Sequence, residues 1–173
     1  MKKIACILLL LSLSSGIAIA QSKKEKKQLR EEDELKHFEA SKALIGSGVF
    51  EFKPDWVTTN FDGQRRPVVR SFFRMNNEEL YAELPVFLQG KEMMRSSVAP
   101  KAVVNVSEVR FEGKVKDYKV KINEKKRTIG IDFKRSSKTE RYTFSFTIMP
   151  DGSASLLLQP ATSPGMTYEG NIN

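Results

Sequence analysis

Apolar and polar residues alternate along most of the chain after residue 49, and the alternation is clearest after residue 115. Three segments there repeat it, joined by short polar turns. Their apolar members are Tyr118, Val120 and Ile122, then Ile129, Ile131 and Phe133, then Tyr142, Phe144, Phe146 and Ile148. Period-two patterns are typical of strands with one buried face, and short turns make neighbouring strands antiparallel. The pattern therefore predicts an antiparallel meander, which the turn at Pro150–Gly152 extends into a strand with Leu156 and Leu158 facing the core.

Less regular alternation predicts further strands on both sides of this meander. They are Phe50–Lys53, Trp56–Asn60, Val68–Met75, Leu80–Leu84, Val103–Phe111 and a closing edge strand at Met166–Ile172. Turns are expected at Phe61–Gln64 and Asn76–Glu78. The apolar parity changes within the Val103 strand, which predicts a β-bulge near Ser107.

Helical spacing replaces the alternation before residue 46. Leu35, Phe38, Lys42 and Ile45 predict a helix over 29–45, which glycines at 46 and 48 end. Residues 21–28 are too polar to bury and are predicted to form a flexible basic arm. The expected fold is α+β, with one domain over 29–173: the helix, then a strongly curved antiparallel sheet or open barrel of about 8–10 strands over 49–173.

The first 20 residues have the pattern of a secretory signal peptide: Lys2 and Lys3, an apolar run, and small residues ending at Ala20. Cleavage is expected near Ala20/Gln21, which would leave a periplasmic or secreted chain with no transmembrane segment. The single cysteine, Cys6, lies inside the apolar run rather than directly after the cleavage point. This position argues against a lipoprotein, and cleavage would remove the cysteine.

Basic residues dominate the meander, with 12 Lys and Arg against five Asp and Glu between residues 110 and 141. The strand pattern places them on the face opposite to the aromatic residues. That separation argues against a single-stranded nucleic acid partner, because bases stack on aromatic side chains. The face is either a solvated surface that discourages aggregation or a docking surface for an anionic partner. The candidate residues for such a partner are Lys119, Lys121, Lys134 and Arg141.

A second candidate site follows Pro85, which has no N–H for a ladder hydrogen bond and should end the strand or place it at a sheet edge. The apolar segment after it has two interpretations. It either folds over an open end of the sheet and completes the core, or forms the lip of a ligand cavity. The candidate ligand- or partner-binding residues are Val86, Phe87, Leu88, Lys91, Met93, Met94 and Arg95.

No catalytic or metal-binding pattern is present in the sequence. His37 is the only histidine, and no nucleophile or ligand set accompanies it. We therefore expect no cofactor and no metal.

Four blocks of the sequence, in order, resemble the domain-of-unknown-function family 4251, whose members are exported proteins of Gram-negative bacteria. The blocks are LYAELPVF, VRFEGKVKDYKVKINEKKRTIGIDF, YTFSFTIMPDGSASLLL and MTYEGNI. The resemblance supplies no catalytic residues. Family members tend to follow the Leu-Pro pair with two aromatic residues and a glycine, whereas here residues 86–89 precede Gly90.

Together these observations favour an exported, non-enzymatic binding or interaction module of the cell envelope. Its partner would be an envelope protein or an apolar or anionic envelope component, and not a nucleic acid. The alternative is a carrier of a lipid or other apolar ligand inside the curved sheet. A cavity lined by Phe144, Phe146 and Leu156 would favour the carrier, and a filled core the module. An envelope hydrolase is a third, weaker possibility.

Overall fold

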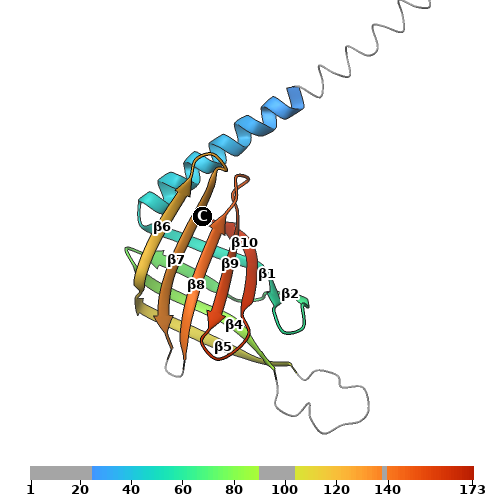
Figure 1. Ribbon diagram of the computed structural model, residues 1–173, viewed down its shortest axis with the longest axis vertical. Coiled ribbons are helices and arrows are strands. Elements are labelled where there is room, and N and C mark those ends of the chain that lie inside the picture. The colour runs from blue at the N-terminus through green and yellow to red at the C-terminus, as the bar shows by residue number, and fades with distance from the viewer. Residues whose placement is uncertain (1–24, 90–103, 138–139) are drawn as a thin grey trace, which may run out of the picture.

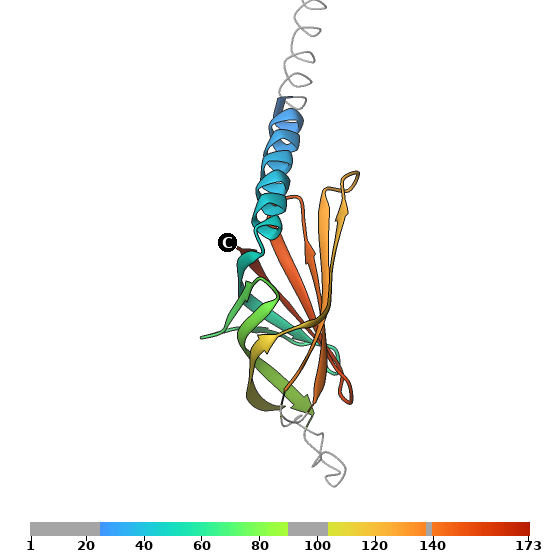
Figure 2. The ribbon, with the colours of Figure 1, turned by 90° about the vertical axis from the view of Figure 1, so that its left-hand side faces the viewer.

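The computed structural model describes residues 25–89, 104–137 and 140–173. It consists of an N-terminal helix and one curled antiparallel sheet that forms a half-barrel (Figures 1 and 2). The strands are β1 (Val49–Thr59), β2 (Arg65–Pro67), β3 (Phe72–Asn76), β4 (Glu79–Gln89), β5 (Val104–Lys114), β6 (Lys116–Asn123), β7 (Thr128–Ser136), β8 (Arg141–Ile148), β9 (Ser153–Pro160) and β10 (Met166–Ile172). Their order across the sheet is β5-β4-β3-β1-β10-β9-β8-β7-β6, and β2 pairs with β1 outside this path. The predicted α+β class and curved antiparallel sheet are confirmed.

The helix packs through its C-terminal half only. Phe38, Ser41 and Ile45 are buried, whereas Leu29 and Leu35 are exposed. Its N-terminal half extends beyond the sheet (Figure 2). Residues 25–28, which we assigned to a flexible arm, are helical and exposed. The polarity of these residues prevents their burial, but it does not prevent them from continuing a helix.

The predicted meander is present as β6–β9, with continuous pairing from β6 to β9. Gly152 has φ +84° in the turn between β8 and β9, a conformation that glycine adopts without steric cost. The strand after this meander differs from the prediction. β10 is not an edge strand, because it pairs with β9 on one side and with β1 on the other.

β1 runs without interruption where the sequence predicts two strands. A register shift between Pro54 and Trp56 against β10 accommodates the proline. Gly170 lies opposite Pro54, and a Cβ atom at position 170 would lie 2.0 Å from the carbonyl oxygen of Lys53. The segment predicted as Val68–Met75 is shorter in the structure: β2 precedes it, and β3 begins at Phe72.

β4 continues past Pro85 and pairs with β5 in unbroken register from Glu79 to Gln89. The predicted bulge near Ser107 was therefore wrong. Pairing with β3 stops at Glu83, and none of the described strands pairs with β4 on that side beyond this residue. There the Tyr168 hydroxyl donates a hydrogen bond of 2.7 Å to the Pro85 carbonyl. The proline thus lies within a strand, at a position where one of the two flanking ladders has already ended.

Aromatic rings fill the inside of the half-barrel. Phe144, Phe146 and Leu156 are at most 2% exposed. The ring centroids of Phe133 and Phe144 lie 4.7 Å apart, and those of Phe73 and Phe146 lie 4.8 Å apart. These are the close contacts of a packed aromatic core.

Candidate anion-binding pocket

A basic pocket of about 390 Å³ lies where β5 ends, β7 ends and β6 and β8 begin. Because neighbouring strands are antiparallel, the end of β7 meets the beginnings of β6 and β8 at one edge of the sheet. The pocket is lined by Lys114, Lys116, Asp117, Lys134, Arg135, Ser136 and Arg141. This lining contains five cationic side chains and one carboxylate. We refer to it below as the basic pocket.

Asp117 is tied to one of these cations. The ammonium of Lys134 lies 2.9 Å from the Asp117 carboxylate, and this hydrogen bond lowers the pKa of Asp117. Asp117 has φ +56°, within the irregular stretch where the pairing of β6 with β7 shifts register. The pair offsets one positive charge, so the pocket retains an excess of positive charge.

Arg135 connects the pocket to the neighbouring strand β5. Its guanidinium donates a hydrogen bond of 2.7 Å to the Lys114 carbonyl and a second one to the Glu112 carbonyl. Gly113 permits this approach, since a Cβ atom there would lie 3.1 Å from Arg135 Nη2. The Nε atom of Arg135 is buried and has no hydrogen-bond acceptor among the described residues. A buried guanidinium N–H without an acceptor is costly, so Arg135 is held here at some expense of stability.

Two of the four residues predicted to face an anionic partner, Lys134 and Arg141, line the basic pocket. The other two, Lys119 and Lys121, lie farther along β6. Lys121 pairs with Asp132 at 3.3 Å, so the flat face of the meander is partly neutralised. The cations that the structure brings together therefore lie at the ends of the strands, and not in the middle of their outward faces.

Sequence reasoning missed the other five pocket residues, Lys114, Lys116, Asp117, Arg135 and Ser136. One signal was available for Arg135, which follows Ile129, Ile131 and Phe133 at period two and so falls on the side of β7 that faces the core. A cation at such a position needs a polar partner. Here the carbonyl groups of β5 serve as that partner.

The candidate lip residues are described only in part. Val86 is 1% exposed and Phe87 is 8% exposed. Neighbouring residues of a strand point to opposite sides, and here both sides are covered. The backbone of Leu88 belongs to β4, whereas Lys91, Met93, Met94 and Arg95 lie outside the described residues. For Val86 and Phe87 the geometry favours the interpretation as core.

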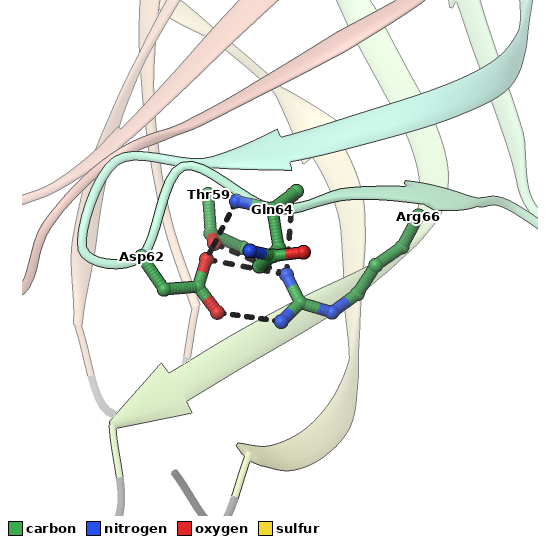
Figure 3. Close-up of polar contacts among 4 residues, drawn as sticks. All are labelled: Thr59, Asp62, Gln64 and Arg66. Atoms are coloured by element: carbon green, nitrogen blue, oxygen red, sulfur yellow. Dashed lines mark hydrogen bonds and ion pairs between the residues drawn. The ribbon is translucent and has the colours of Figure 1, made fainter.

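Hydrogen bonds and an ion pair join Thr59, Asp62, Gln64 and Arg66 into a polar cluster (Figure 3). Its Arg66 lies over the ring of Phe87. Arg66 lies 2.5 Å from Asp62, and its guanidinium carbon is 5.3 Å from the centre of the Phe87 ring. Asp62 also accepts hydrogen bonds from the backbone N–H of Gln64, at 3.0 Å, and from the fully buried Thr59 hydroxyl. The hydrogen bond from Arg66 keeps the pKa of Asp62 far below its ordinary value. This Asp62 cluster fastens the turn between β1 and β2 over the core, and its carboxylate is poorly suited to act as a base.

Within the described residues, no three histidine, cysteine or acidic side chains gather closely enough to hold a metal ion. His37 is exposed on the helix. Of the helical residues that the structure describes, none form a stretch long and apolar enough to span a membrane.

The comparisons with known proteins agree with this fold. The family model described as Domain of unknown function (DUF4251) matches residues 31–172. The chain belongs to this family. A crystal structure of a DUF4251 family protein from Bacteroides eggerthii DSM 20697 is similar with a TM-score of 0.57 and 19% identity, covering 80% of this chain and 87% of that one. At this identity the likeness shows the fold shared by the two DUF4251 chains. No curated protein matches the chain.

Proposed function

We propose that this DUF4251 protein is an exported, non-enzymatic binding module that holds an anionic group of a cell-envelope partner in the basic pocket. The observation that carries the proposal is the lining of the pocket, which has five cationic side chains and one carboxylate. Clustered cations of this kind attract anions from solution and hold them by charge-assisted hydrogen bonds.

A binding role is better supported than catalysis. A carboxyl group is an efficient general acid or base at neutral pH when its pKa is raised toward neutrality. The pKa of Asp117, the carboxylate of the pocket, is shifted in the opposite direction by Lys134. Asp117 is therefore held in its charged carboxylate form beside Lys134, which suits a binding site better than proton transfer.

The filled core supports a module rather than a carrier of apolar ligands. A carrier would need space beside Phe144, Phe146 and Leu156. Their side chains are buried, and the two rings pack directly against neighbouring rings. The proposed anion-binding site lies instead outside the core, where β5 and β7 end and β6 and β8 begin.

Export is proposed from the signal-peptide pattern of residues 1–20. The full chain should be expressed in a Gram-negative bacterium and its mass measured after release of the periplasm. The measured mass should be that of a chain that begins at Gln21. Full-length chain that stays in the cytoplasm would contradict export. It would not bear on anion binding by the basic pocket, which is tested separately.

Binding is tested by titrating inorganic phosphate into isotope-labelled mature chain and following the backbone amide signals by NMR. We expect saturable shifts confined to residues 114–117 and 134–141, with millimolar affinity for so small an anion. Replacing two pocket cations, Lys114→Gln with Arg141→Gln, should weaken binding by about tenfold. The control Lys125→Gln with Lys126→Gln changes the net charge equally in the turn after β6. Equal weakening in both variants, or shifts spread over the whole surface, would refute a specific pocket.

A further inference from the structure

β6 is the border strand of the sheet, and β7 is the strand with which it pairs among the described residues (Figure 1). A border strand leaves a row of backbone N–H and C=O groups unpaired, ready for an additional strand. Most edge strands are protected by being short, covered or charged on the exposed side. β6 has eight residues, and none of them is fully buried.

The apolar face of β6 is unusually open. Val120 and Ile122 are 39% and 48% exposed, whereas Ile131 and Ile129, directly opposite them on β7, are 0% exposed. Only Tyr118, at the beginning of the strand, contacts the core, with its ring centroid 6.1 Å from that of Phe133. Among the described residues the hydrophobic core therefore ends at β7, and they cover Val120 and Ile122 on β6 much less completely than the residues opposite on β7.

The opposite face of β6 is basic. Lys119 and Lys121 lie at alternate positions. The Lys121 side chain pairs with Asp132 at 3.3 Å and is still 75% exposed, so it remains accessible to an added strand. An added strand would place one set of its side chains beside these lysines and the other set beside Val120 and Ile122. Opposite charges on neighbouring strands attract, and apolar pairs bury area. The matching sequence is one that alternates acidic and β-branched residues.

We propose that β6 is a docking edge that takes an extended acidic–apolar segment of another protein as an additional strand. The inference rests on the proposed binding role and names a polypeptide as the partner. Its surface does not include Lys114 and Arg141, the two pocket cations that are replaced in the phosphate test. Main-chain hydrogen bonds provide affinity in this mode of recognition, and the alternating side chains provide specificity.

A second copy of this chain matches the edge poorly. Pairing of β6 with β6 would bring the lysines of two copies together, and like charges on neighbouring strands repel. The other border strand, β5, carries acidic residues, including Glu108 and Glu112. However, Arg135 from β7 already occupies the Glu112 and Lys114 carbonyl groups of β5. The lysines thus disfavour self-pairing and select an acidic partner.

The test uses an eight-residue synthetic peptide that alternates glutamate with valine, and a control peptide that alternates lysine with valine. Binding to the mature chain is measured by fluorescence anisotropy, and hydrogen exchange of the backbone amides is measured with and without peptide. We expect the glutamate peptide to bind at least tenfold more tightly than the lysine peptide. Bound peptide should slow exchange at alternate amides of residues 116–123.

Two matched variants locate the contact. Lys119→Gln with Lys121→Gln should weaken binding of the glutamate peptide by about tenfold, whereas Lys125→Gln with Lys126→Gln should leave it nearly unchanged. Ile122→Asp should also weaken binding, and its circular dichroism reports whether the fold is intact. Phosphate binding at the basic pocket should persist in all three, so that a loss of peptide binding is distinguishable from failure of the proposed function.

Three outcomes would overturn the proposal. Peptide binding without slower exchange in β6 would show charge attraction rather than strand addition. Equal loss in the two lysine variants would show a diffuse electrostatic effect. Concentration-dependent self-association in the absence of peptide, abolished by Ile122→Asp, would make a second copy the occupant of the edge.

Discussion

Replacing Asp62 with asparagine removes one negative charge from the Asp62 cluster while keeping the shape of the side chain. The carboxylate lies 2.5 Å from Arg66, and the side chains of Asp62 and Arg66 are 18% and 24% exposed. It also accepts hydrogen bonds from the Gln64 N–H and from the buried Thr59 hydroxyl. An amide retains one acceptor oxygen but cannot form the ion pair, and the partner Arg66 then covers Phe87 with an uncompensated charge.

The free energy of unfolding should fall by about 1–2 kcal/mol at neutral pH, since the lost interactions are charge-assisted but only partly buried. For a domain of this size the melting temperature should decrease by about 2–6 °C. Urea unfolding followed by circular dichroism gives both the midpoint and the slope. Asp55→Asn, at an exposed carboxylate in the preceding strand β1, is the matched control and should change the free energy of unfolding by less than about 0.5 kcal/mol.

The difference should also depend on pH in a defined direction. Because the folded state lowers the pKa of Asp62, its contribution is fully present above the unfolded pKa of about 3.9 and is lost as the pH falls toward the folded value. The gap between the wild-type chain and Asp62→Asn should therefore shrink by about 1 kcal/mol between pH 5 and pH 3. Equal stabilities at neutral pH, or a gap that widens on acidification, would refute this account of the cluster.

Two other substitutions test the packing. Gly170→Ala should destabilise the chain by more than about 2 kcal/mol in urea unfolding, because its Cβ would lie 2.0 Å from the Lys53 carbonyl oxygen; Gly46→Ala, which meets nothing within 4 Å, should be neutral or slightly stabilising. A tolerated Gly170→Ala would contradict the close pairing of β1 with β10. Phe87→Asp should unfold the chain, as judged by amide NMR dispersion, because the ring is 8% exposed, while Phe72→Asp, at a residue 49% exposed, should leave the fold intact. A folded Phe87→Asp variant that loses only partner binding would instead support the lip interpretation.

The meander was predictable because each of its strands carries a regular alternation and each connection is short. β1 was divided in two because a proline and a change of parity resemble a strand boundary, whereas a register shift opposite Gly170 absorbs both. β10 was placed at an edge because pairing between segments more than 100 residues apart leaves no local pattern. The basic pocket was only half anticipated. Alternation identifies faces, but Arg135 acts across the gap between β7 and β5, which depends on how strongly the sheet curls.

The central position of β10 bears on the order of folding. β1 and β9 are neighbours of β10 and not of each other, so β10 joins the N-terminal strands to the meander through two ladders. Residues 49–89 cannot complete their side of the core until Met166–Ile172 have been synthesised, and contacts of such long sequence separation form slowly. A chain with this topology remains open during its own synthesis. Under the export proposed above, this late closure would keep the polypeptide unfolded, and so able to pass through a translocation channel, until its last strand has been synthesised.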